Sequence, residues 1–216
     1  MYYSQSGQDK YLNEVIFKGK KNGIFLDIGA NDGITYSNSY FFEKELGWKG
    51  VCVEPIPSTY EKLNVLRKSI NLNCGISIEE GLKEFLLIEG YSEMLSGLTD
   101  KYDERHIERI ENELKQFGGK AEKIKVPCRN INSIFEEYQL HKIDYCTIDI
   151  EGGEFEIIKS IDFAKVDIRA FSIENNYNDE DLRSYMKSKN YELRTTLEAD
   201  EIYIRKNSFV QRLFSW

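Results

Sequence analysis

A short apolar run that ends in a glycine turn constrains the fold more than any other part of this 216-residue chain. Residues 23–29, GIFLDIG, are typical of a buried strand, and Gly29 and Gly33 frame the turn that leads from it toward a helix. Glycines in such a turn let a ligand approach the backbone closely, and the first turn of the helix offers free N–H donors. The segment therefore predicts a ligand site at the end of a parallel strand.

An acid at the end of a second apolar run extends this pattern. Residues 50–55, GVCVEP, predict another buried strand, which Pro55 stops, and Glu54 lies 25 residues after Gly29. A carboxylate at this place can accept hydrogen bonds from both hydroxyls of a ribose. The two segments together predict a nucleoside site at the carboxyl ends of adjacent strands.

The charges around the turn favour one class of nucleoside. The spacing of Gly29 and Gly33 breaks the G-x-G-x-x-G pattern of dinucleotide sites, and the chain has no G-K-[ST] phosphate loop. Asp27 and Asp32 flank the turn, where carboxylates would repel a pyrophosphate but attract a sulfonium or an ammonium group. S-adenosylmethionine carries both cations and no phosphate, so the acids fit it better than they fit NAD or ATP.

Strands and helices alternate along the chain, which predicts an α/β fold with helices on the faces of a mostly parallel sheet. Ser58 and Glu61 have the spacing of a capping box for one of the helices. The predicted helices are 37–46, 58–68, 131–138, 154–161 and 179–188. The predicted further strands are 73–78, 83–88, 123–128, 142–150 and 167–174, followed by a hairpin of 191–197 and 201–205.

Residues 90–122 differ from the rest because they are highly charged and bracketed by glycines. Within them Ile107, Ile110, Leu114 and Phe117 form one apolar stripe at helical spacing, and we interpret this segment as an insertion, helical around 98–119, that packs over the sheet edge. His106 lies on a polar part of it, where we expect it to face solvent; if the helix is a lid, His106 is a candidate base. The amphipathic tail 207–216 is expected to dock on the domain or on a homodimer partner.

Composition excludes several classes of protein. The net charge of −8 disfavours binding to a nucleic-acid backbone, and no run reaches the roughly 18 apolar residues of a membrane helix. The N-terminus lacks the pattern of a signal peptide, and the four cysteines lack metal-site spacing. We therefore expect a single cytoplasmic domain over 1–216 with reduced core thiols.

Five segments together resemble the FkbM family of S-adenosylmethionine-dependent O-methyltransferases. They are SQSGQD (4–9), FLDIGANDGITYSNS (25–39), LGWKGVCVEPIP (46–57), SGL (96–98) and IDIEGGEFEIIKSID (148–162). The resemblance implies a Rossmann-like class I fold, with a seven-stranded sheet whose last strand is antiparallel. It also implies methylation of hydroxyls on sugars or on polyketide- and glycan-type metabolites, so we expect a sugar or glycoconjugate acceptor.

Carboxylates near the fourth core strand are the candidates for chemistry. Methyl transfer to a hydroxyl needs two oriented reactants and a base, for which Asp149 is the first candidate, Glu151 the second, and Glu174 an assistant. We interpret Glu154 as an acid at the start of a helix. Asp149, Glu174 and Asn175 are all oxygen ligands, and we hypothesise that they hold Mg²⁺.

The cofactor site is expected to draw on the glycine turn, the strand ends and the N-terminal segment. Ser37 is a candidate for the methionine carboxylate or a local cap, and Ser77 for adenine. Gln8, with Asp9, either closes over the cofactor or begins a surface helix. The expected set is Gln8, Asp27, Gly29, Ala30, Asn31, Asp32, Gly33, Ser37, Glu54, Pro55, Ser77 and Asp149.

Three other functions remain open at this point. The first is a methyltransferase that acts on a non-sugar small molecule or on a protein. It stays open because the variable insertion would form the acceptor pocket. A non-catalytic nucleoside-binding domain would keep the same fold, although Asp27, Gly29 and Glu54 are all present. A nicotinamide oxidoreductase is disfavoured by the broken glycine pattern.

Overall fold

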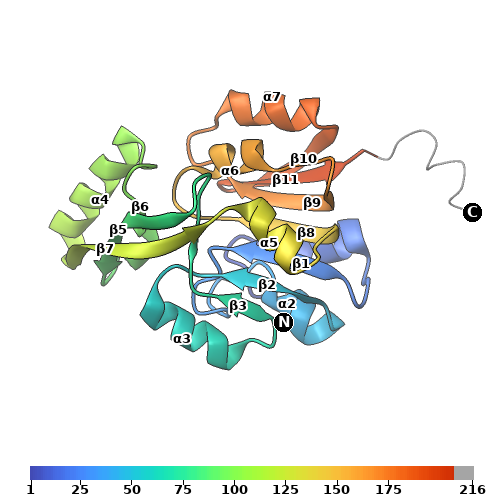
Figure 1. Cartoon of the computed structure of the whole chain (residues 1–216), viewed down its shortest axis with the longest axis horizontal. Helices are drawn as coiled ribbons and strands as arrows, with labels where there is room; N and C mark the ends of the chain where they lie inside the picture. Colours follow the sequence, from blue (N-terminus) through green and yellow to red (C-terminus); the bar gives the residue numbers. More distant parts are fainter. Residues whose placement is uncertain (207–216) are drawn as a thin grey trace, which may run out of the picture.

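A seven-stranded sheet forms the centre of the protein in a computed structural model that describes residues 1–206 (Figure 1). Its strand order is β10-β11-β9-β8-β1-β2-β3, and β11 alone among these strands runs antiparallel to both neighbours. The strands are β1 (Ile24–Ile28), β2 (Lys49–Val53), β3 (Ile70–Leu72), β8 (Lys142–Ile148), β9 (Asp167–Glu174), β10 (Tyr191–Leu197) and β11 (Asp200–Arg205). The predicted fold class and the antiparallel last strand are confirmed.

Apolar strands at the centre of the sheet explain the helices on both faces, because each face must be covered. On one face, Leu26 and Ile28 pack in a core with α5 (Ile131–Glu137), α6 (Glu154–Ser160) and α7 (Glu180–Ser188). On the other face, Phe25 packs with residues of the N-terminal helices and of the second and third α-helices. These are α1 (Gln8–Tyr11), the π-helix η1 (Leu12–Phe17), α2 (Tyr40–Leu46) and α3 (Pro57–Leu66).

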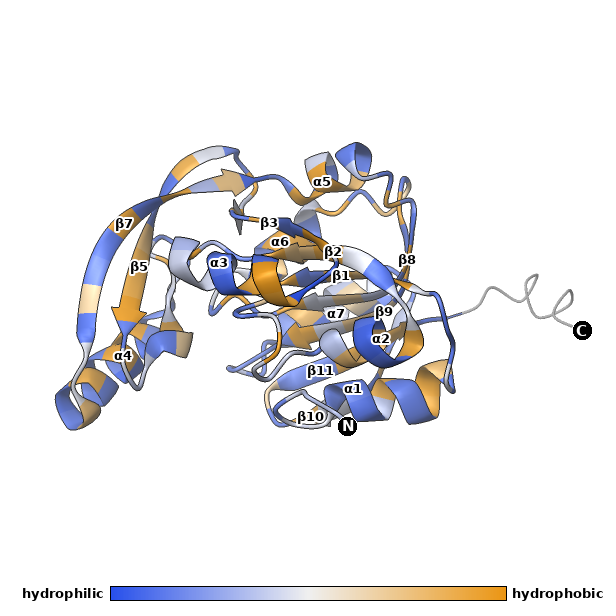
Figure 2. Cartoon of the chain, turned by 90° about the horizontal axis from the view of Figure 1, so that it is seen from below, coloured by the Kyte–Doolittle hydropathy of each residue, from blue (hydrophilic) through white to orange (hydrophobic). Residues whose placement is uncertain are grey.

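A second sheet projects from one side of the first and carries the charged insertion (Figures 1 and 2). Its order is β4-β7-β5-β6. The strands are β4 (Gly75–Ile76), β5 (Gly81–Glu89), β6 (Gly97–Leu98) and β7 (Lys120–Arg129). The short helix η2 (Glu93–Leu95) and the long helix α4 (Glu104–Phe117) connect them. The predicted helix of the insertion is present, and the arm that carries it is the paired β5 and β7.

Two predicted elements differ from the structure. The third strand of the main sheet is β3, whereas residues 73–78 contribute only β4, which belongs to the second sheet. β3 is a three-residue edge strand with no fully buried residue, so it lacks the apolar run that marks a buried strand. The capping box is wrong as well: Ile56 is the N-cap of α3 and Pro57 occupies its first turn, where proline fits best.

Three further expectations concern the cysteines, the membrane and the tail. All four cysteines are free and buried, as predicted. Within residues 1–206 no helix has the length and apolar character needed to cross a membrane. The amphipathic tail lies outside the described residues.

A buried arginine ties the glycine turn to the helices beside it. The side chain of Arg67, at the end of α3, is fully buried and forms an ion pair with Glu43 at 3.0 Å. It also donates to the Gly33 carbonyl and to Ser39 Oγ, each at 2.9 Å. Its guanidinium lies over the Phe25 ring, 5.3 Å from the centroid. Arg67 therefore fastens the end of the turn to the underlying core.

Replacing Arg67 with methionine is expected to lower the free energy of unfolding by about 3–5 kcal/mol, because the largely buried Glu43 carboxylate would lose its cationic partner. The matched control is R194M, since Arg194 is half-exposed and pairs with the half-exposed Glu192. That change should cost less than about 1 kcal/mol. Urea denaturation of both variants provides the measurement, and equal effects would contradict the proposed role of Arg67.

Candidate active site

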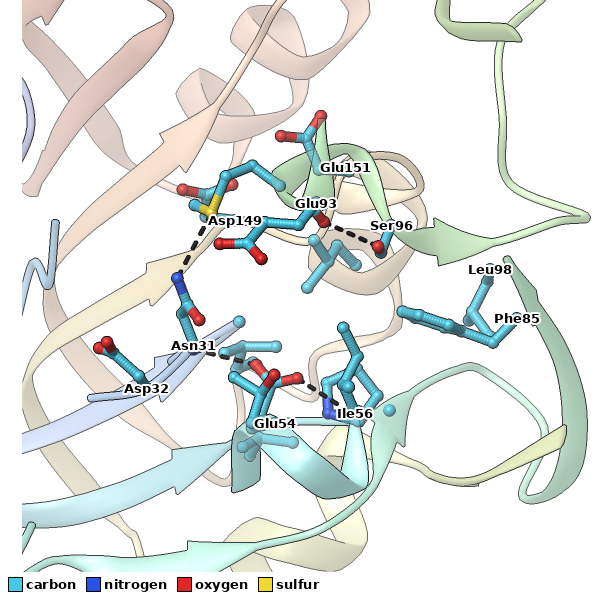
Figure 3. Close-up of a pocket in the computed structure, with 18 of the residues that line it drawn as sticks. Asn31, Asp32, Glu54, Ile56, Phe85, Glu93, Ser96, Leu98, Asp149 and Glu151 are labelled. Carbon is cyan, nitrogen blue, oxygen red and sulfur yellow. Dashed lines mark hydrogen bonds between the residues drawn. The ribbon is translucent and has the colours of Figure 1, made fainter. Parts of the chain in front are cut away.

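A cavity of about 310 Å³ opens at the carboxyl ends of β1 and β2, between the main sheet and the second sheet (Figure 3). Polar groups of the main sheet line one part of it, with Glu54 facing Asp149 and Glu151 across the space. Apolar side chains line the rest, and Phe85 and Leu98 reach it from the second sheet. We call this the first cavity. A polar end beside an apolar slot suits a ligand that has a sugar and a flat base.

The glycine turn is shaped by a close approach of two backbone segments. Gly29 has a φ of +89°, and a Cβ at this position would lie 1.7 Å from the carbonyl oxygen of Asp149. Gly33 has a φ of +86°, and its Cβ would meet side-chain atoms of Leu63 and Arg67 at 2.6–2.7 Å. The glycines are thus required by protein packing. Gly29 and Asn31 line the first cavity, whereas Gly33 supports the turn from behind.

Glu54 holds the turn and faces the first cavity at the same time. One carboxylate oxygen accepts the Asn31 N–H at 2.9 Å, and the other accepts the Ile56 N–H at 2.8 Å (Figure 3). Each oxygen keeps a second lone pair for a ligand hydroxyl. Burial raises the pKa of Glu54 to about 7, although the two backbone hydrogen bonds oppose this. Glu54, the residue predicted to bind a ribose, therefore lies on the wall of the first cavity.

The two acids that flank the turn have different environments. Asp27 is buried and accepts a hydrogen bond from Ser39 Oγ; burial raises its pKa, against the attraction of Arg67. Asp32 accepts the backbone N–H groups of Ile34 and Thr35 and the Thr35 hydroxyl at 2.7–2.9 Å. Partial burial raises the pKa of Asp32, but these hydrogen bonds outweigh it and the net shift is downward. Asp32 lines the first cavity as an ionised group.

Three carboxylates gather where β8 and β9 end. Oxygens of Asp149, Glu151 and Glu174 lie within 4.8 Å of one another. Burial is the main cause that raises the pKa of each: well above the usual range for Asp149 and Glu174, which also repel each other, and to about 7 for Glu151. We call this set the acidic trio. Such oxygens hold protons or a cation more readily than exposed carboxylates do.

Asn175, one of the three predicted magnesium ligands, uses its side-chain amide in local hydrogen bonds. Its Oδ1 accepts the Asp179 N–H at 2.7 Å and its Nδ2 donates to the Asp179 carbonyl at 3.3 Å, so the amide shapes the loop before α7. Glu151, the second candidate base, lies beside Asp149 and Glu174. Glu154 is structural, as interpreted, because it accepts the N–H groups of Gly152 and Ile150 at 2.8 and 3.3 Å.

His106 is buried, and the expectation that it faces solvent is wrong. Its ring stacks on Tyr102, and its Nε2 lies 3.3 Å from the Leu95 carbonyl oxygen. Its Nδ1 lies 3.7 Å from Glu151 Oε2. The buried side of α4 runs through His106 and Ile110, which leaves Ile107 and Phe117 of the predicted stripe about half exposed. The aromatic stack and the carbonyl contact thus rotate the helix away from its apolar stripe.

A second cavity, of about 410 Å³, adjoins the acidic trio. The start of α4, the turn between β8 and α6, and the loop between β9 and α7 enclose it, and it shares Glu151 and Gly152 with the first cavity. The basic groups on its wall already have partners: Lys101 contacts Glu156 at 2.7 Å, and Arg105 contacts Asp103 at 2.7 Å. Arg105 also lies over the Tyr177 ring, 3.8 Å from its centroid. The second cavity is polar, and Glu151 stands at the passage between the two.

A third, small cavity of about 40 Å³ lies on the other side of the glycine turn, under the N-terminal segment. Gln8, Ala30 and Ser37 line it, as do Asp27 and Asp149. Gln8 donates a hydrogen bond to Asp200 of the last hairpin, and the two side chains together close one side of this cavity.

Three predicted residues have structural surroundings. Asp9 accepts the Tyr3 N–H and the Ser4 hydroxyl, each at 2.6 Å, which folds the N-terminal segment. Ser37 Oγ accepts the Tyr40 N–H at 3.1 Å as a local cap. Ser77 is buried beyond β4, outside the lining of the three cavities, although Pro55 and Ile76 line the first.

The family model for the methyltransferase FkbM domain matches residues 27–193. The chain belongs to this family. The curated protein "Methyltransferase sdnD" of Sordaria araneosa is 28% identical over 164 residues, which are 65% of this chain and 61% of that protein. The chain therefore spans about three fifths of the length of that relative.

Solved structures of low identity also resemble this FkbM-domain protein. Methyltransferase FkbM from Methylobacillus flagellatus KT has 16% identity and a TM-score of 0.48, covering 85% of this chain and 43% of that one. A protein of the NADB-Rossmann superfamily from Streptococcus agalactiae has 15% identity and a TM-score of 0.46, covering 99% and 74%.

Three lining residues of the FkbM-domain protein are absent from the predicted site set. Met94, from η2, lies with its sulfur 3.4 Å from Asn31 Nδ2 and lines the first and third cavities. Asn38 and Asp200 line the third cavity. Asn38 follows the glycine turn closely in the sequence, and this position could have marked it as a candidate site residue. Asp200 lies in a remote hairpin outside the range that matches the family.

Replacing Gly29 with alanine is expected to destabilise this FkbM-domain protein by about 3 kcal/mol or more, because the new Cβ would overlap the Asp149 carbonyl. The matched control is G19A. Gly19 also has a positive φ, +73°, but nothing lies within 4 Å of its Cβ position. That change should cost only about 1 kcal/mol of backbone strain. Thermal and urea unfolding measure both, and similar losses would refute the steric explanation.

Proposed function

We propose that the protein is an S-adenosylmethionine-dependent O-methyltransferase that methylates a hydroxyl of a sugar or glycan acceptor. The observation that carries the proposal is the meeting of two cavities at the acidic trio. The first has the shape and polarity for a nucleoside, and the second is polar and roomy. Membership of the FkbM family supports the methyltransferase part of the proposal.

The residues of the first cavity fit the nucleoside of S-adenosylmethionine. Glu54 retains acceptor capacity toward the cavity, and Ile76, Phe85 and Leu98 offer an apolar slot for adenine. The aspartates at the turn and at the end of β8 favour a cation next to the ribose site. When bound there, the cofactor would supply an electrophilic methyl group on its sulfonium.

Glu151 is the proposed base for the acceptor hydroxyl. It lines both cavities, and its raised pKa makes it a stronger base than an ordinary glutamate. The hydroxyl proton would pass to its carboxylate as the oxygen gains the methyl group. Asp149 and Glu174 would orient the acceptor by hydrogen bonds. A polyhydroxylated acceptor suits the second cavity because its wall offers carboxylate, amide and hydroxyl partners.

The acidic trio also has the donor chemistry of a magnesium site, since all three ligands are carboxylate oxygens. As the alternative to a free carboxylate base, the Mg²⁺ hypothesis therefore includes Glu151 beside Asp149 and Glu174. There an ion would lower the pKa of the acceptor hydroxyl and orient it.

Substitution of Glu54 tests the cofactor. Wild-type protein is expected to bind S-adenosylmethionine in isothermal titration calorimetry, and E54Q should weaken binding by about 10- to 100-fold because the ribose loses an ionised acceptor. Since the ionised carboxylate binds the ribose, wild-type affinity should rise as the pH increases through about 7, and E54Q should lose that dependence. E61Q is the control, because Glu61 is an exposed acid of α3 that does not line the first cavity. Absence of binding at millimolar cofactor would refute the proposal.

The pH profile of methyl transfer tests the base. The rate under saturating substrates should rise as the pH passes about 7, because Glu151 must lose its proton to act. E151Q should lower kcat by about 10²–10⁴-fold, while cofactor affinity changes little. E108Q, at an exposed acid of α4 outside the lining of the three cavities, is the control. If Glu151 is the base, activity should persist in EDTA. Loss of activity in EDTA and its recovery with Mg²⁺ would instead indicate that a metal ion at the same oxygens activates the hydroxyl.

A further inference from the structure

Two buried polar atoms face each other at the wall of the second cavity. Oε2 of Glu151 is buried and has no hydrogen-bond partner among residues 1–206. Nδ1 of His106, whose side chain is 3% exposed, lies 3.7 Å from that oxygen, which is too far for a direct hydrogen bond. Both residues line the second cavity. Because buried polar atoms are nearly always paired, the two atoms together indicate a polar group that comes from a ligand.

The surroundings of the His106 ring make Nδ1 an acceptor. Nε2 lies 3.3 Å from the Leu95 carbonyl oxygen, and since that oxygen can only accept, the hydrogen of a neutral ring is on Nε2. Burial lowers the pKa of His106, against the Leu95 contact, and so favours the neutral ring. Tyr102 stacks on the ring with centroids 4.6 Å apart, and its hydroxyl donates to the same carbonyl at 2.9 Å. Nδ1 is therefore held toward Glu151 with a free lone pair.

Two acceptors at this separation can share one donor group. An atom about 2.9 Å from each would have them about 80° apart, which suits a group with two or more hydrogens on one atom. A hydroxyl has a single hydrogen to donate, whereas water has two and a primary ammonium has three. The geometry thus selects an ammonium group or a water molecule as the shared donor.

The charge of the second cavity favours the ammonium. Acids outnumber lysines and arginines in its lining, and each of those cations contacts an acid of the same wall, as described above. No ion pair within residues 1–206 gives Glu151 or Glu174 a lysine or arginine partner. Arg109 attracts Glu151 from outside the lining, but its Nε contacts Glu113 at 2.9 Å. A cationic ligand would therefore be attracted to this wall, whereas a phosphate or a carboxylate would be repelled.

We propose that the methylated acceptor carries a primary amine, and that Nδ1 of His106 and Oε2 of Glu151 bind its ammonium group in the second cavity. This inference rests on the proposed function and narrows the acceptor to an amino sugar or a similar amino alcohol. Glu151 lines both cavities, so one of its oxygens would hold the ammonium while the other faces the hydroxyl. The methyl group goes to the oxygen, because a protonated nitrogen has no lone pair to attack the sulfonium.

Histidine NMR with three small probes tests the site. The chain has two histidines, and H141Q removes the exposed one, so its ¹⁵N-histidine spectrum reports His106 alone. Ethanolamine, ethylene glycol and glycolate present an ammonium, a hydroxyl and a carboxylate beside the same hydroxyl. At constant pH, ethanolamine should shift the His106 Nδ1 resonance and bind about 10-fold or more tighter than ethylene glycol, and glycolate should not bind. E151Q should weaken ethanolamine binding by about 10-fold or more, whereas the control E108Q should not.

Matched sugars test the same contact during methyl transfer. The probes are pairs of methyl hexosides that differ only by an amino group in place of one hydroxyl. Wild-type protein should prefer the amino member of a pair by about 10-fold or more in kcat/KM, and H106Q should cut that preference to about twofold. Glutamine can still donate to Leu95 but has no acceptor at the Nδ1 position. The kcat/KM for the neutral sugar should therefore stay within about twofold of wild type, which a merely structural role of His106 does not predict.

Each result has a distinct meaning. A His106 resonance that ignores ethanolamine, or that responds equally to ethylene glycol, would overturn the inference, because a water molecule would then occupy the site. An equal loss of kcat/KM for both sugars in H106Q, or methylation of the amine itself, would overturn it as well. A response to ethanolamine without any binding of S-adenosylmethionine would instead refute the proposed function. If H106Q does not fold, the NMR titrations of H141Q with and without E151Q decide the inference.

Discussion

The contact between Gly29 and the carbonyl of Asp149 is the constraint on which the rest of the site depends. No side chain fits between the two backbones, since a Cβ on Gly29 would lie 1.7 Å from that oxygen. β1 and β8 are neighbours in the parallel sheet, and Asp149 N donates to the Ile28 carbonyl just beyond the ladder. The turn after β1 and the turn after β8 therefore pack directly on each other. This contact places the first cavity, the acidic trio and the third cavity around one point of the sheet.

The same edge concentrates acids whose burial opposes folding. Asp149, Glu151 and Glu174 all have raised pKa values, with burial as the main cause, so their ionised forms destabilise the native state. Those carboxyls bind protons more tightly in the folded state than in the unfolded state. Their protonation therefore stabilises the folded state, and this contribution is lost as the pH rises. Asp32 is the contrasting case, because three hydrogen bonds from Ile34 and Thr35 stabilise its ionised form and lower its pKa. The acids of the trio, whose pKa values are raised instead, face the first and second cavities, and perturbed acids in cavities are typical of sites with a chemical role.

Sequence patterns predicted what depends on local spacing. The strand–turn pattern located Gly29, Asn31 and Glu54 at one cavity, because apolar periodicity marks a buried strand and parallel strands end at the same edge of a sheet. Tertiary contacts decided the rest. The burial of His106 comes from its stack on Tyr102, and the surroundings of Asn175 come from a loop contact with Asp179. β3 escaped prediction because an edge strand of three residues needs no apolar run.

The second sheet explains how one chain builds two different walls around the same acids. β5 and β7 pair over nine positions, from Gly81 with Cys128 to Glu89 with Lys120, and this long ladder carries η2 and α4 away from the main sheet. Met94 of η2 then lines the first cavity, while His106 of α4 approaches Glu151 from the side of the second cavity. Changes in α4 can therefore alter the second cavity while the contacts of Glu54 stay in place. The first cavity rests on the main sheet through Glu54 and the glycine turn, whereas the second cavity is bordered by α4 of the insertion.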